Sequence, residues 1–283
     1  FLEGIATFVA GTACLSLIAD RTSTEERGPV TGMVWTLMMV GIIVTGVGAS
    51  VFMRTYAFER MVMLFVIGSA VALLLTIFAL WRQEPRSRSD VQKSSEGLRT
   101  AVRLLVRSRH SRRFAVFLIV GMFSYFMQDV ILEPFGGEVF ELPPAETTRF
   151  NTYMGIGVVL GMLIGGIRLI PRLGKRSVAG IGCWIMAAAF FGLAISGFSR
   201  TSSILVPIIA LLGLGAGFFT VGSVSLMMDM TASDHTGLFV GAWTLVQAIA
   251  KGPASVLSGS LQGLLLAIGA MPGQAYGTVF ALE

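Results

Sequence analysis

The sequence predicts an all-α protein, a polytopic bundle of helices that crosses a membrane several times. Of its 283 residues, 54% are hydrophobic and 13% are charged, whereas about a quarter of the residues in a soluble domain are charged. The apolar runs are roughly 20 residues long, the length at which a helix crosses the bilayer core. They lack the alternation of barrel strands, and only helices satisfy their own backbone polar groups in lipid.

Eight apolar runs predict eight membrane-spanning helices, and a ninth helix begins near Tyr276. The chain starts inside the first run, without Met and without a cleavable signal pattern. We therefore expect a fragment of a longer protein. In chain order the predicted spans lie near residues 1–19, 30–53, 61–81, 114–133, 151–170, 177–198, 203–228 and 238–260.

Positive charge in the connections predicts the orientation of the spans. Residues 82–113 carry ten Lys and Arg side chains, and residues 168–176 carry four. The positive-inside rule places both connections in the cytoplasm. The connections at 54–60, 134–150 and 199–202 carry two, one and one, so they face the other side. The net charge of +5 thus reflects the excess of Lys and Arg in the cytoplasmic connections. The sequence contains no basic patch with interleaved aromatic residues, the pattern that would indicate binding to nucleic acid.

The long basic connection contains an amphipathic pattern. Leu98, Ala101, Val102 and Leu105 fall on one helical face, and arginines occupy another. This pattern predicts a helix that lies on the anionic cytoplasmic surface of the membrane. A solvated linker is the alternative interpretation.

An internal repeat relates two connections at a constant offset of 209 residues. Six predicted spans separate the two copies, and because this number is even, both copies lie on the cytoplasmic side. The repeated residues predict a structural loop motif, in which Asp and Thr cap a turn and glycines allow close helix contact; a gating role is the alternative. The motif comprises Asp20, Arg21, Thr22, Gly28 and Gly32 in the first copy, and Asp229, Thr231, Gly237 and Gly241 in the second.

Parallel duplication of a six-helix unit resembles the two halves of the major facilitator superfamily. The resemblance implies a chain that runs from about the fourth helix to the start of the twelfth. It also implies three parts: the latter part of the N-terminal half at 1–81, the basic connection at 82–113, and the C-terminal half at 114–283. The stretch GGIRLIPRLGKR, from Gly165, resembles a degenerate copy of the superfamily's cytoplasmic motif, with Pro171 where an acid would stand. That departure weakens any claim of a charge-relay switch in this loop.

No motif for enzymatic chemistry is present, so we expect no enzyme. The sequence has no Walker sequence, HExxH motif, zinc-type Cys spacing or Ser/His/Asp set. Both histidines, His110 and His235, fall in predicted cytoplasmic connections. Cys14 and Cys183 lie in separate apolar runs, where they are expected to be buried small hydrophobic residues. We therefore expect neither His nor Cys to provide a metal site within the membrane. We therefore expect neither a nucleotide nor a transition metal. The spaced glycines Gly157, Gly161 and Gly165 predict helix packing.

The stretch GMFSYFMQDVILEPFGGEVFELP, residues 121–143, places two acids at the end of a predicted span. Spacing by four residues puts Tyr125, Asp129 and Glu133 on one helical stripe. We expect the helix to break at Pro134 and the following glycines, which would put Glu133 at the far interface and Asp129 roughly 6 Å deeper. An intramembrane carboxylate costs on the order of a few kcal/mol.

Two interpretations account for these acids. In the first, interfacial water solvates Glu133, and Asp129 forms hydrogen bonds within the bundle. In the second, a polar partner or a ligand compensates the charge. Lys251 is the basic residue that lies well inside an apolar span, about 21 Å from the cytoplasmic edge, a depth close to that expected for Asp129. We predict that Lys251 approaches Asp129 or Glu133.

Two stretches carry a family resemblance that spans essentially the whole chain. QDVILEPFGGEVFELP and IADRTSTEERGPVTGMVWTLMMVGIIV closely resemble the PucC/LhaA family of light-harvesting complex assembly proteins. The resemblance implies an assembly factor for the bacterial antenna complexes LH1 or LH2, located in the inner or intracytoplasmic photosynthetic membrane. Its expected cofactors are bacteriochlorophyll and carotenoid, and its expected partners are antenna polypeptides and the reaction centre.

The expected pigment or partner site is built from side chains with oxygen donors, which magnesium accepts. Gln128, Asp129, Glu133 and Glu138 form this site, and Asn151 is a further oxygen donor. The alternative function is a proton-coupled secondary transporter of a tetrapyrrole or another amphipathic molecule. Transporters usually place polar groups near the membrane midplane, and the expected position of these acids near one surface favours the assembly function.

Overall fold

The computed structural model describes residue 10 and residues 27–53, 57–81, 109–229 and 236–283. Every regular element in these ranges is a helix, which confirms the all-α class. Five of the described helices are long and apolar enough to cross a membrane. They lie within Phe58–Ala79, Arg112–Phe140, Pro144–Leu173, Lys175–Ser199 and Leu205–Met227, and each coincides with a predicted span.

The helices follow the apolar runs of the sequence closely. The long ones are α2 (Arg27–Phe52), α3 (Phe58–Leu80), α5 (Arg109–Phe140), α7 (Arg149–Ile164), α9 (Lys175–Ser199), α10 (Leu205–Asp229), α11 (Thr236–Ala267) and α12 (Pro272–Leu282). Short elements join them: α6 (Pro144–Thr147), the π-helical turn η1 (Gly165–Leu169) and α8 (Ile170–Leu173).

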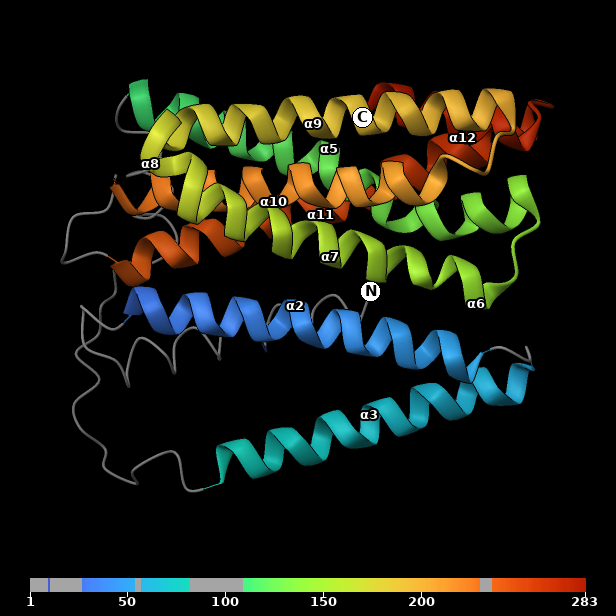
Figure 1. The fold of residues 1–283 in the computed structure, drawn as a ribbon. Coiled ribbons are helices and arrows are strands. Elements are labelled where there is room, and N and C mark those ends of the chain that lie inside the picture. The colour runs from blue at the N-terminus through green and yellow to red at the C-terminus, as the bar shows by residue number, and fades with distance from the viewer. Residues whose placement is uncertain (1–9, 11–26, 54–56, 82–108, 230–235) are drawn as a thin grey trace.

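The long helices run side by side, as Figure 1 shows. Helix α10 packs against both α7 and α9, α5 packs against α11, and α12 packs against α9. Helix α2 lies along α7, and α3 lies at the outer edge of the molecule, next to α2. The most buried aromatic side chains cluster where α5 meets α12: the Phe135 ring centroid is 5.5 Å from that of Tyr276 and 5.0 Å from that of Phe280.

Glycines set the close approach of α10 to its neighbours. A Cβ atom added at Gly157 or Gly161 of α7 would collide with the backbone of α10. The glycines that face them, Gly213 and Gly217, are packed as tightly against the backbone of α7. The packing role predicted for the α7 glycines is therefore confirmed, and it depends on backbone-to-backbone contact.

Helix α5 continues past the point where the sequence predicts a break, so that prediction is wrong. Pro134 lies inside the helix, which runs on to Phe140 and ends where Glu141 adopts a φ of 56°. Gly136 acts as a packing residue, because a Cβ atom there would collide with the Phe150 and Thr147 side chains. A membrane helix tolerates such an internal Pro because contacts with neighbouring helices and side chains compensate for the lost backbone hydrogen bond.

Several predictions fall outside the described residues. These are the first span, the amphipathic helix of the basic connection, and the loop residues Asp20, Arg21, Thr22 and Thr231. The backbone of the remaining motif residues is described: Gly28 and Gly32 lie in α2, Asp229 ends α10, and Gly237 and Gly241 lie in the first turns of α11. The expected duplication and its capping turns therefore stay predictions.

Candidate functional site

The polar stripe of α5 reaches two neighbouring helices. Tyr125, Asp129 and Glu133 each contact a different residue, and the three contacts together join α5 to α7 and α11. The Tyr125 hydroxyl lies 4.0 Å from the sulfur of Met154 on α7. The stripe predicted from four-residue spacing is thus present as a row of interhelical contacts.

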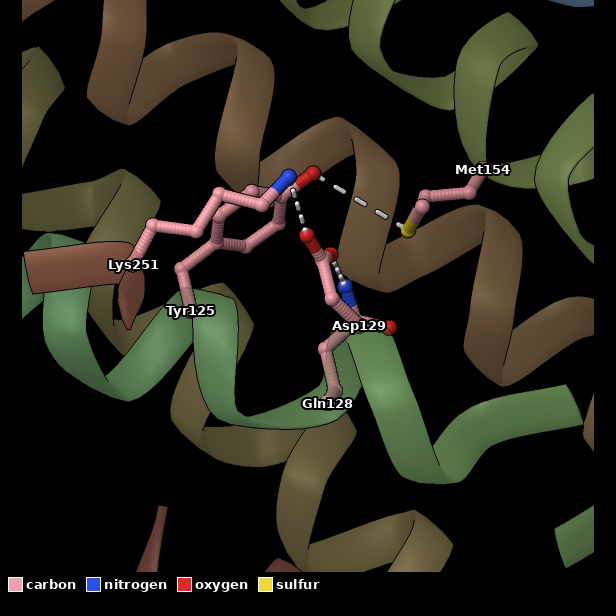
Figure 2. Close-up of polar contacts among 5 residues, drawn as sticks. All are labelled: Tyr125, Gln128, Asp129, Met154 and Lys251. Atoms are coloured by element: carbon pink, nitrogen blue, oxygen red, sulfur yellow. Dashed lines mark hydrogen bonds and ion pairs between the residues drawn. The ribbon is translucent and has the colours of Figure 1, made fainter. Parts of the chain in front are cut away.

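An ion pair forms the centre of this row (Figure 2). The Lys251 Nζ atom lies 3.0 Å from Asp129 Oδ2, which confirms the predicted approach of these two side chains. Gln128, only 1% exposed, donates a 2.7 Å hydrogen bond from its amide nitrogen to Asp129 Oδ1. The Lys251 ammonium also lies 5.2 Å from the Phe126 ring centroid, within range of a cation–π interaction.

The ion pair lies deep along both helices. Asp129 stands 11 residues before the end of α5 at Phe140, which is about 16 Å. Lys251 stands near the middle of α11, 15 residues after Thr236. Because α5 does not break at Pro134, Asp129 lies farther from the end of its helix than the sequence predicts. The two side chains together are formally neutral, so each charge offsets the insertion cost of the other.

Glu133 pairs with Asn151 of α7 rather than with Lys251. The Asn151 side-chain amide donates a hydrogen bond to Glu133 Oε1. Both residues are half-buried, so Asn151 contributes to the compensation of the Glu133 charge, and solvation of the other oxygen by interfacial water stays a prediction. Asn151 was expected as an oxygen donor, whereas here its nitrogen makes the contact.

Asn151→Leu is expected to destabilise the contact between α5 and α7. The substitution keeps a similar volume but leaves the Glu133 carboxylate without its donor, a loss of about 1–3 kcal/mol. The measurement is the thermal unfolding midpoint of the purified protein in detergent. Glu133→Gln in the Asn151→Leu background is the matched control and should recover most of the loss, because a neutral amide is less costly to leave unpaired. A midpoint unchanged by Asn151→Leu would contradict the role of this bond.

Glu138 lies apart from the ion pair. It is exposed near the end of α5, and its carboxylate lies close enough to Tyr276 of α12 for an electrostatic interaction. The structure therefore divides the predicted site: Gln128, Asp129 and Lys251 come together, Glu133 pairs with α7, and Glu138 lies toward α12. Sequence reasoning missed Phe126 and Met154. Phe126 could have been found as the aromatic residue one turn before Asp129, whereas nothing in the sequence singles out Met154.

The oxygen donors near the pair are largely engaged. Both Asp129 oxygens have partners, Lys251 and Gln128, which leaves fewer free lone pairs for a magnesium ion, and the pigment role of Asp129 stays a prediction. Glu133 Oε1 is held by Asn151, and the other oxygen of that carboxylate has no partner in the described part of the chain. Within the same ranges, no three His, Cys, Asp or Glu side chains converge to hold a metal ion.

Comparison with known proteins gives a match over the whole chain. The sequence model of the family described as "PUCC protein" matches residues 1–283. A protein of Rhodobacter capsulatus named "Bacteriochlorophyll synthase 44.5 kDa chain" is 30% identical over 293 aligned positions, covering 100% of this chain and 67% of the relative. "Protein PucC" of Cereibacter sphaeroides is 30% identical, covering 96% of this chain and 61% of the relative.

A third relative is identified only by its genetic location. It is named "Uncharacterized protein in puhA-bchM intergenic region", also from Rhodobacter capsulatus, and is 27% identical over 93% of this chain. The chain covers 56% of that relative's length. The chain thus spans between about half and two thirds of the length of these curated relatives.

Proposed function

The chain belongs to the PUCC protein family, and from this premise we propose that it assists the assembly of light-harvesting antenna complexes in a bacterial photosynthetic membrane. The observation that carries the proposal is the family match over all 283 residues. The printed names of the relatives, one of which refers to bacteriochlorophyll, agree with a light-harvesting role.

In this proposal the polar contacts of Tyr125, Asp129 and Glu133 on α5 fix the positions of the packed helices relative to one another. The ion pair to α11 and the Asn151 hydrogen bond to α7 hold three helices in register inside the bilayer. The partners are antenna polypeptides and the reaction centre, and the pigments handled are bacteriochlorophyll and carotenoid. A protein in this role binds and escorts its cargo, so no catalytic residues are assigned.

The contact of the chain with bacteriochlorophyll would be made by polar groups that keep a free oxygen. Glu133 fits better than Asp129, because one Glu133 oxygen has no partner in the described residues while both Asp129 oxygens are engaged. The pigment supplies the light-absorbing macrocycle and its magnesium. The chain would orient it, and Gln128 and Lys251 would keep Asp129 neutralised beside it.

A proton-coupled transporter is the second candidate, and one observation favours it. The Asp129–Lys251 pair lies about 16 Å along the helix from the end of α5, whereas the sequence predicts the acids at the end of their helix. A charge pair at this depth suits a site that exchanges protons during transport. The position of the pair therefore does not by itself favour assembly, and the family match over the whole chain is what supports assembly in this proposal.

Purification of the full-length protein in mild detergent tests the two candidates. Co-purification of antenna polypeptides, together with an absorption spectrum of bound bacteriochlorophyll, is the result expected for an assembly factor. A purified protein without bound pigment would instead support the transporter, provided that vesicles containing it accumulate a tetrapyrrole when a proton gradient is applied. Glu133→Gln should lower the bound pigment without lowering the protein yield, because Asn151 can still hydrogen-bond the amide oxygen.

A further inference from the structure

The turn between α8 and α9 combines a shallow, open cavity with a cluster of basic side chains. The cavity has a volume of ≈ 420 Å³ and is lined by Ile170, Leu173, Gly174, Lys175, Arg176 and Leu226. Its lining thus combines apolar and cationic side chains. Two further arginines, Arg168 and Arg172, lie within about one turn of the lining residues along the same helix.

The local backbone explains how these charges come together. The π-helical turn η1 and the short α8 extend α7 to Leu173, and the four-residue spacing of Arg168 and Arg172 puts them on the same helical face. Gly174 then reverses the chain with a φ of 81°, a conformation that favours glycine. The reversal brings Lys175 and Arg176 beside the end of α8 without any intervening residue.

The charge of this turn is not neutralised by acids nearby in the sequence. Residues 165–176 contain three arginines and one lysine but neither Asp nor Glu. Arg168, Arg172 and Arg176 are exposed and have no ion-pair or hydrogen-bond partner among the residues that the structure describes. Lys175 already takes part in another interaction, so the arginines provide the charge that a ligand would meet.

The position of the turn selects the ligand. It lies at one end of two apolar helices that are long enough to span a membrane, and the positive-inside rule places this end in the cytoplasm. The cytoplasmic leaflet is anionic, and basic pockets at its surface bind anionic lipid headgroups. Leu173 is 49% exposed beside the cations, which provides an apolar surface for the upper part of an acyl chain.

We propose that the α8–α9 turn is a binding site for the phosphate headgroup of an anionic phospholipid of the cytoplasmic leaflet. Arg176 at the cavity wall and Arg172 on the adjacent turn bind the phosphate, and Leu173 with Leu226 contacts the acyl chain. Such a lipid anchors the contact among α7, α9 and α10 to the membrane surface. This site does not depend on the function proposed for the ion pair at Asp129.

Lipid titration of the purified full-length protein, followed by native mass spectrometry, tests the site. The probes are phosphatidylglycerol and phosphatidylcholine with the same acyl chains. We expect preferential binding of phosphatidylglycerol, and an affinity loss of about tenfold or more in the double variant Arg172→Gln/Arg176→Gln. Arg200→Gln, which removes one exposed charge at the opposite end of α9, should leave the preference unchanged.

Two further measurements distinguish a lipid site from a general anion site and from a loss of folding. Leu173→Gln should weaken phosphatidylglycerol binding while leaving any binding of inorganic phosphate unchanged. The unfolding midpoint of the double variant without added lipid should match the wild type, because both side chains are exposed. Equal binding of the two lipids, an equal loss in Arg200→Gln, or displacement of the lipid by an equal concentration of inorganic phosphate would overturn the proposal.

Discussion

Lys251→Met is expected to reduce the stability of the protein by about 2–4 kcal/mol, with a matching drop in its yield from membranes. The substitution leaves Asp129 charged inside the bundle, with Gln128 as its remaining described hydrogen-bond donor. The loss is discounted from that of a fully buried pair, because the Lys251 side chain is 48% exposed and that of Asp129 is 24% exposed. The measurement is thermal unfolding of the purified protein in detergent.

A double-mutant cycle isolates the ion pair from other effects of the substitutions. Asp129→Asn alone should also destabilise, because it leaves the Lys251 ammonium unpaired at membrane depth. Combining Asp129→Asn with Lys251→Met removes both charges, and this double variant should be more stable than either single variant. Losses that simply add in the double variant would show that the two side chains do not stabilise each other.

Gly182→Ala is expected to destabilise the contact between α9 and α10 by about 2 kcal/mol or more. A Cβ atom at Gly182 would lie 2.7 Å from the carbonyl oxygen of Gly215 on α10. The obstruction is backbone, which cannot rotate away as a side chain could, so relief requires the two helices to separate. Detergent unfolding midpoints, together with the fraction of protein that remains monodisperse, report the effect.

Gly180→Ala is the matched control for this prediction. Gly180 lies two residues earlier on the same helix, and a Cβ atom there would meet nothing within 4 Å. Because alanine favours a helix over glycine, this variant should be neutral or more stable by up to roughly 1 kcal/mol. A similar loss of stability in both variants would contradict the close contact of α9 and α10 at Gly182.

Local properties of the chain are sufficient to predict the class of the fold and the approach of its intramembrane charges. Apolar run length predicts helices of about the right extent, because the bilayer thickness fixes how many residues a helix needs to cross it. The same counting gave Asp129 and Lys251 comparable depths, and two costly charges at one depth are expected to pair. The confirmed ion pair therefore follows from the composition of two separate segments.

How the helices meet, and where α5 ends, depends on contacts between distant segments. Pro134 and Gly136 are local signals of a break, but contacts with Phe150 and Thr147 use Gly136 as a packing surface and the helix continues to Phe140. Glu133 pairs with Asn151 of α7, whereas Asp129 on the same stripe pairs with Lys251 of α11. The rotation of each helix, the distance between helices and the choice of hydrogen-bond partner depend on residues far apart in the chain. A local sequence pattern therefore does not predict them.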